Sequence, residues 1–204
     1  MNLVYQFSET KWNLYVSFVL DLMVGAGLVL FALLNYEFEG VYMFFAIAGG
    51  WLLFTLIEYG VHAVLFHVGR NVFVRGHGKH HKNPQGYDNL PFFAATLIAG
   101  GMYLVANMLM PQVYALAMTG VTMLSYVAYT WYHFAMHRFD FKNPYGKYMQ
   151  RFHYVHHIRP KMNHGVTVPI WDVVFGTYEP LRKHQHHFNE DLKLRPDDKI
   201  IRED

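Results

Sequence analysis

The chain has 204 residues, of which 53% are apolar and 18% are aromatic, while only 16% are charged. This composition is too apolar for an ordinary soluble domain and indicates a membrane protein. A formal net charge of +2 at pH 7 is too small to indicate a nucleic-acid partner, and the lack of cysteine excludes disulfides, thiolate metal sites and a cysteine nucleophile. The unusual residue is histidine, which occurs 14 times.

Four apolar runs follow one another along the chain, and each is long enough to cross a hydrocarbon core of about 30 Å as a helix. The sequence predicts them at residues 13–35, 41–66, 91–110 and 113–136. The first two runs carry one acid each, Asp21 and Glu58, and the last two carry no charged residue. Short loops join the runs in pairs, so we expect an all-α integral membrane protein with four transmembrane helices in two hairpins. The polar segments 67–90 and 137–204 are expected to form a helical cap, and residues 1–204 a single domain.

Positive charges give the predicted orientation of these runs. All 17 Lys and Arg residues lie in three places, with one before the first run, four between residues 67 and 90, and twelve after residue 137. Because basic loops stay in the cytoplasm, both termini and the cap are expected there, in a bacterial inner membrane or in the endoplasmic reticulum of a eukaryote. The core of a large soluble protein is a weaker interpretation, because the runs lack the polar faces of a soluble bundle.

Ten of the histidines fall in four motifs at the predicted cytoplasmic end. "HAVLFH" ends the second run, "HGKHH" lies in the basic loop, "HFAMH" ends the fourth run and "HYVHH" opens the C-terminal cap. The ten residues are His62, His67, His77, His80, His81, His133, His137, His153, His156 and His157. On a helix, residues three or four apart share a face. Each of the last three motifs can therefore direct its histidines to one ion or to two adjacent ions.

The number of histidines indicates two ions. Ten imidazoles exceed the four to six positions around one ion, whereas about five ligands on each of two ions would leave positions open for dioxygen. His62 and His67 are five residues apart, about 140° around an ideal helix. That spacing suits two neighbouring metals or a helix that unwinds at its end. Imidazole without thiolate suits Fe, Zn, Cu or Ni, while a structural zinc site would close with four ligands.

With the stretches "EYGVHAVLFH" and "NHGVTVPIWDVVFGTYEP", the motifs resemble the fatty acid hydroxylase superfamily, which includes sterol desaturase-like and carotenoid hydroxylase-like enzymes. The similarity covers roughly residues 55–180, and "HGKHHKNP" is similar to the fatty acid and sphingolipid 2-hydroxylases in particular. The resemblance implies a cytoplasmic cap and an all-histidine centre in which these ten residues hold two iron ions. It also implies a diiron-type monooxygenase that uses O2 to hydroxylate a lipid acyl chain, with the 2-position as the expected site. Zinc can replace iron on purification.

The sequence also departs from this family. Its eukaryotic 2-hydroxylases often carry a fused b-type haem domain, and no HPGG motif occurs in these residues, so electrons are expected from a separate donor, a b-type cytochrome or a ferredoxin with its reductase. His164 stands where the family often has an aromatic residue, which argues against a role as ligand. The histidines of "HQHH" at 184–187 lie beyond the motifs and are interpreted as part of a solvated tail.

Two acids are candidates for the surroundings of the ligands. Glu58 lies one turn before His62, and Asp172 lies in the "IWDVVFG" stretch. A carboxylate that accepts a hydrogen bond from a metal-bound imidazole orients it, and this is one interpretation of both acids. The alternative is a snorkelling or buried acid with a local partner.

Other functions stay open at this point. The substrate could be a sterol or a carotenoid, hydroxylated or desaturated by an enzyme of the same superfamily. A membrane metal transporter would also place histidine in the bilayer, but it would need ligands near the midplane along a path, and these gather at one end. A structural metal-binding protein would need fewer ligands in closed sites.

Overall fold

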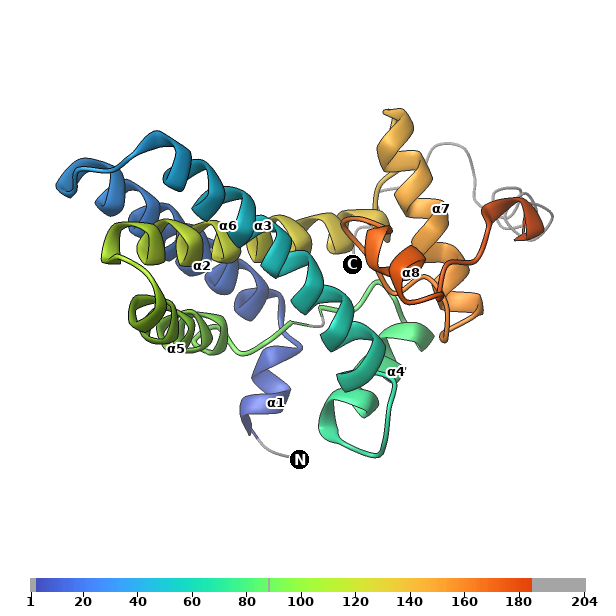
Figure 1. Ribbon diagram of the computed structural model, residues 1–204. Coiled ribbons are helices and arrows are strands. Elements are labelled where there is room, and N and C mark those ends of the chain that lie inside the picture. Colours follow the sequence, from blue (N-terminus) through green and yellow to red (C-terminus); the bar gives the residue numbers. More distant parts are fainter. Residues whose placement is uncertain (1–2, 88, 185–204) are drawn as a thin grey trace. The chain divides into compact units, whose positions relative to one another are not determined.

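The structure is a computed structural model that describes residues 3–87 and 89–184 (Figure 1). Within these residues the chain is all-helical, as predicted. In chain order the helices are α1 (Leu3–Ser8), α2 (Lys11–Asn35), α3 (Gly40–Gly60), the π-helix η1 (Val61–Leu65), α4 (Val72–Lys82), α5 (Ala94–Leu109), α6 (Gln112–Met136), α7 (Pro144–Ile158), α8 (Ile170–Val174) and the 3-10 helix η2 (Leu181–His184).

Three helices are apolar and long enough to cross a membrane, judged by length and composition. They are Lys11–Asn35, Gly40–Leu65 and Gln112–Met136, and each agrees with a predicted run to within two residues. The remaining run was predicted too long, because α5 has 16 residues and therefore a length of about 24 Å. Pro91 lies in the turn that precedes the helix, where its carbonyl accepts from the Ala94 amide (2.8 Å).

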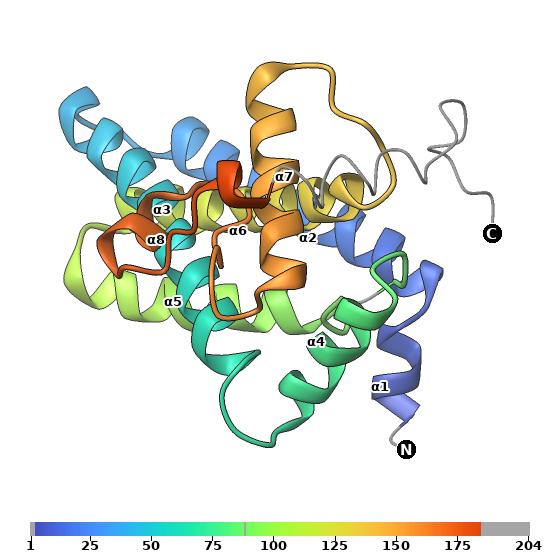
Figure 2. The ribbon, with the colours of Figure 1, turned by 90° about the vertical axis from the view of Figure 1, so that its right-hand side faces the viewer.

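The chain divides into two compact units. The first unit comprises Met1–Phe54 and Gly86–Trp131, and the second comprises Thr55–Gln85 and Tyr132–Asp204, each within the described residues. The first unit therefore contains α1, α2 and α5 with most of α3 and α6. The second contains the end of α3, η1, α4, the end of α6, α7, α8 and η2, of which α4, α7 and α8 face the viewer in Figure 2.

Close contact between apolar helices holds the first unit together. Its main buried cluster joins α2, α3 and α6 through Ala32, Met43, Ala46, Val113, Leu116 and Ala117. Helix α2 meets α6 where Gly25 faces Gly120, and a Cβ built on Gly120 would lie 2.8 Å from the carbonyl oxygen of Gly25. Small residues at such crossings let two backbones approach, which drives helix association where lipid removes the hydrophobic effect.

Buried polar side chains tie α2 to the segment before α5 in the same unit. Asn13 donates to the Leu90 carbonyl (2.8 Å) and accepts from the Phe92 amide (2.9 Å). The sequence suggested no partner for the acid in the first run, and the structure shows that Thr96 of α5 donates to Asp21 (3.3 Å). These contacts satisfy polar groups that would otherwise be costly among apolar helices.

We expect Gly120→Ala to lower the stability of the protein by about 1–3 kcal/mol, because the added methyl group would press on the α2 backbone. The measurement is thermal unfolding in detergent. Gly100→Ala is the matched control, since nothing lies within 4 Å of a Cβ at Gly100, and it should leave the transition unchanged. Equal transitions for the two variants would contradict this account of the crossing.

Candidate metal centre

A π-helix ends α3 and brings two of the predicted histidines together. In η1 the Phe66 amide donates to the carbonyl of Val61 (3.0 Å), five residues back. The rings of His62 and His67 consequently stack, with centroids 5.4 Å apart and planes 26° from parallel. Of the two explanations for the five-residue spacing, the structure shows the change in helix winding.

The two "HxxHH" motifs lie on capped helices of the second unit. The Asn71 side chain accepts from the Val74 amide (2.9 Å) and begins α4. Asn143 does the same for α7 through the Gly146 amide (2.7 Å), with Pro144 in the first turn. Such caps satisfy amides that have no partner within the helix. They fix where each helix begins and hence which side chains it directs inward.

The structure gathers all ten predicted histidines into two groups of five. The first group is His62, His67, His77, His81 and His156, and the second group is His80, His133, His137, His153 and His157. Within each group one ring nitrogen per histidine lies within 4.8 Å of the others. Each "HxxHH" motif gives its first and last histidines to one group and its middle histidine to the other.

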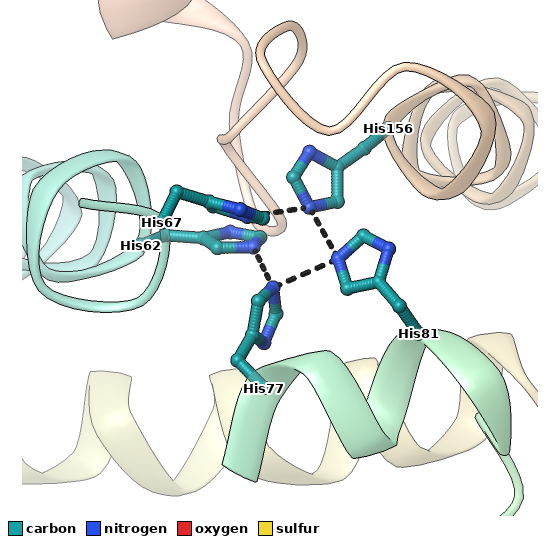
Figure 3. Close-up of side chains that lie close together, drawn as sticks. All are labelled: His62, His67, His77, His81 and His156. Atoms are coloured by element: carbon teal, nitrogen blue, oxygen red, sulfur yellow. Dashed lines mark hydrogen bonds between the residues drawn. The ribbon is translucent and has the colours of Figure 1, made fainter. Parts of the chain in front are cut away.

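In the first group the Nε2 atoms face a common centre (Figure 3). The Nε2 of His77 lies 3.0 Å from that of His62 and 2.9 Å from that of His81. The Nε2 of His156 lies 3.1 Å from that of His81 and 3.2 Å from that of His67. Helices η1, α4 and α7 and the turn after η1 thus direct five imidazoles toward one point.

In the second group His153 of α7 is central. Its Nε2 lies 3.0 Å from the Nε2 of each of His133, His137 and His157. The His80 ring approaches the same group, with its centroid 4.6 Å from that of His133. The group therefore repeats the arrangement of the first, with the end of α6 in place of the end of α3.

Backbone carbonyls determine the tautomer of two imidazoles in the first group. The Nδ1–H of His62 donates to the carbonyl oxygen of His164 (2.5 Å), and that of His156 donates to the carbonyl oxygen of Met162 (2.8 Å). A neutral imidazole carries one N–H, and a carbonyl oxygen can only accept. The Nε2 atoms of both histidines are therefore lone-pair donors that point into the group.

The imidazoles are also kept neutral. Burial lowers the pKa of His67 to about 4 and that of His81 to about 4. Burial likewise lowers the pKa of His153 and of His156 well below the usual value. At pH 7 these rings carry no added proton, so each offers one ring nitrogen whose lone pair is available to a cation.

The nitrogen spacing fits metal ions. An ion about 2.1 Å from each imidazole nitrogen places two ligands at right angles about 3.0 Å apart. The first group has neighbouring Nε2 distances of 2.9–3.2 Å, and the second group has distances of 3.0–3.4 Å. Both groups consist of imidazole nitrogens without thiolate or carboxylate, a set that suits a transition metal.

A loop between α7 and α8 supplies both of the carbonyls. Asn163 lies between Met162 and His164 with a positive φ of 56°, a conformation that asparagine tolerates better than most residues. The Asn163 side chain accepts from the Glu179 amide (2.7 Å) and donates to the Glu179 carbonyl (3.2 Å). These bonds hold the start of residues 162–167, a segment that we call the carbonyl loop.

Two buried carboxylates hold the rest of the carbonyl loop. Asp172 accepts from the amides of His164 (2.7 Å) and Gly165 (2.8 Å). Glu58 accepts from the amides of Val166 (2.5 Å) and Thr167 (2.9 Å). The sequence left two interpretations for each acid, a hydrogen bond to an imidazole or a buried acid with another partner, and the bonds to the loop agree with the second. Each bonds the backbone of the loop, because the face of α3 that bears Glu58 lies against residues 166–167.

His164 belongs to neither group. Its side chain is 4% exposed, and its ring centroid lies 5.3–5.6 Å from those of His62, His67 and His156. Sequence reasoning missed that this residue acts through its backbone carbonyl, a group that no side-chain pattern reveals. Of the tail histidines, His184 ends η2, whereas His186 and His187 lie outside the described residues.

Comparison with known proteins places this site in a family. Residues 47–177 match the fatty acid hydroxylase family, and the chain belongs to it. The matched segment contains all ten grouped histidines, the carbonyl loop and Glu58.

Named relatives and a solved structure agree with this membership. A dihydroceramide fatty acyl 2-hydroxylase of Arabidopsis thaliana is 32% identical over 140 residues, which cover 64% of this chain and 59% of that protein. A fatty acid 2-hydroxylase of Homo sapiens is 29% identical, covering 87% of this chain and 48% of that protein. The solved structure of full-length scs7p, in which only the hydroxylase domain is visible, has a TM-score of 0.74 at 27% identity, covering 88% of this chain and 71% of that one. The chain spans about half to three-fifths of the length of the two named relatives.

We expect Glu58→Gln to loosen the carbonyl loop. The amide would turn an N–H group toward donors that now meet a carboxylate, and lost hydrogen bonds of this kind cost about 1–3 kcal/mol. Hydrogen–deuterium exchange should accelerate in peptides that contain Val166 and Thr167. The exposed Glu37 supplies the control Glu37→Gln, which should not change exchange there. Unchanged exchange in Glu58→Gln would contradict this role of the carboxylate.

Proposed function

We propose that this protein is a membrane-bound non-haem dimetal monooxygenase of the diiron type that hydroxylates a lipid acyl chain. The 2-position of a fatty acid or sphingolipid is the expected site. The observation that supports this proposal most directly is the pair of all-histidine groups, each with five ring nitrogens at metal-ligand spacing. The names of the relatives, which are 2-hydroxylases of fatty acids and dihydroceramide, support the reaction and the substrate class.

The ten histidines would hold two iron ions, one in each group, and zinc could take their place on purification. The chemistry that such ions supply when bound is the activation of O2 for insertion into an unactivated C–H bond. Five ligands in each group are fewer than the six positions of an octahedral ion. The donor set is therefore compatible with an open position at each ion, which a closed four-ligand structural site lacks.

The residues around the ligands prepare the site before any ion or substrate enters. The carbonyl loop fixes the tautomer of His62 and His156, so that no proton has to move when a metal binds. Burial keeps His67 and His81 neutral. The protein thus supplies fixed lone pairs in a site withdrawn from water, and lipid and O2 are its expected substrates.

The proposal includes the membrane topology and the electron source. Helices α2, α3 with η1, and α6 would each cross the bilayer, and α5 with its apolar flanks would complete a fourth crossing, since a helix shorter than the hydrocarbon core is accommodated by local thinning. Both termini and the histidine groups would face the cytoplasm. The two units would act as one functional domain, and a separate b-type cytochrome or ferredoxin with its reductase would supply electrons.

Replacing one histidine from each group tests the function. His80→Ala removes a nitrogen from the second group and His156→Ala removes one from the first. Each change should reduce lipid hydroxylation by about 100-fold or more, and the double variant should be no worse, because ligands of one centre act as a unit. The measurement is hydroxylated lipid in cells that express each variant at equal protein level. Metal analysis of the unchanged protein should find about two ions per chain.

His186→Ala is the control, because the tail lies beyond the four motifs, and it should keep hydroxylation within a few-fold. Hydroxylation that persists in both His80→Ala and His156→Ala would overturn the dimetal oxygenase and favour a binding or transport protein. A single tightly held ion in the unchanged protein would overturn the two-ion centre. Loss of activity in His186→Ala at normal metal content would show that the site extends into the tail.

Reporter fusions test the topology. A reporter inserted after Glu39 follows one crossing, whereas a reporter at the C-terminus follows four. The two should therefore report opposite sides of the membrane, with the C-terminal one in the cytoplasm. Reporters on the same side would contradict three crossings between those points.

A further inference from the structure

Helix α8 carries an exposed apolar surface in a part of the chain that the sequence assigned to a polar cap. Ile170 is 46% exposed, Val173 63%, Val174 60% and Phe175 56%. Asp172 is the one charged residue between Val166 and Thr177, and it is fully buried against the carbonyl loop. These four apolar residues form a surface that we call the α8 face. It therefore contains no charge.

The segment that bears the α8 face lies along the end of α3, within the second unit. The Trp171 Nε1–H donates to Thr55 Oγ1 (3.0 Å). The Phe175 ring stacks on that of Tyr59, with centroids 5.1 Å apart and planes 18° from parallel. The Tyr59 hydroxyl also hydrogen-bonds Thr177 Oγ1 (3.0 Å). Residues 171–177 consequently run beside α3 between Thr55 and Tyr59.

The contacts with Thr55 and Tyr59 determine how deep α8 lies in the membrane. This step rests on the proposed crossing of the membrane by α3. The crossing segment Gly40–Leu65 has 26 residues, which corresponds to about 39 Å of helix, compared with a hydrocarbon core of about 30 Å. Thr55 lies ten residues before Leu65, about 15 Å along the axis. With the segment centred in the bilayer, Thr55 lies about 10 Å inside the hydrocarbon boundary.

We propose that α8 is embedded in the membrane leaflet next to the histidine groups, with the α8 face in contact with lipid hydrocarbon. Lipid fits this surface because the face continues the apolar side of a membrane-crossing helix and contains no charge. The neighbouring α3 residues Leu56 and Ile57 are themselves 39% and 38% exposed. Short amphipathic segments that lie at the interface in this way bury one face among acyl chains and keep the other on the protein.

Single cysteines can measure the depth directly, because the native chain has none. Val174→Cys, Ile57→Cys and Lys147→Cys would each be labelled with a nitroxide in the full chain, in phosphatidylcholine nanodiscs. Ile57 lies on α3 at comparable depth, and Lys147 is an exposed cation on α7. Electron paramagnetic resonance then compares collisions with O2, which concentrates in hydrocarbon, and with chromium oxalate, which stays in water.

The label at residue 174 should behave like the label at residue 57, with frequent collisions with O2 and few with chromium oxalate, and opposite to the label at residue 147. A label at residue 174 that meets chromium oxalate as often as the label at residue 147 would overturn the inference. So would a label shielded from both reagents, which would mean that protein covers the face. A water-exposed label at residue 57 would instead overturn the proposed crossing itself. Val173→Cys repeats the measurement on the same face in case Val174→Cys does not fold.

Discussion

Closely spaced imidazole nitrogens need either a proton or a cation between them, and the second unit gathers ten imidazoles into two such groups. Burial disfavours an added proton on His67 and His81, because it lowers the pKa of each to about 4. The carbonyls of Met162 and His164 remove the alternative in which His156 or His62 turns an N–H inward. A cation in the first group would therefore meet lone pairs that already point inward on these two rings.

The two groups share their helices in a reciprocal way. Helix α4 gives His77 and His81 to the first group and His80 to the second, while α7 gives His153 and His157 to the second group and His156 to the first. In each motif the first and last histidines are four residues apart and lie on the same side of the helix. The middle histidine, three residues after the first, points in a different direction from the last one and so reaches the other group. Neither helix can therefore move without disturbing both groups. This sharing explains how two separate ions could be held at a fixed separation.

The sequence was sufficient to find the ten histidines that the structure gathers into two groups, because spacing on a helix is a local property. It could not divide them between the groups, because the division depends on how α4 and α7 face each other. It identified Glu58 and Asp172 as buried acids of interest but not their partners, since the partner of Glu58 lies 109 residues away at Thr167. Backbone carbonyls carry no residue-type signal, so the carbonyl loop was missed. The length of α5 was overestimated because apolar composition continues through Pro91, where the helix has not yet begun.

The end of α3 meets residues 164–177 along a single stripe. Thr55 accepts from Trp171, Glu58 accepts from Thr167, and His62 donates to the carbonyl of His164. These three positions keep regular α-helical register, and the π-helix then adds one residue before His67. Each residue of an α-helix turns the chain by about 100°. Regular α-helical winding through this stretch would place His67 about 140° around the axis from His62 and away from its group. The backbone winding of this stretch is therefore what brings the two histidines into one group, whereas Ala63, Val64 and Leu65 contribute no side chain to either group.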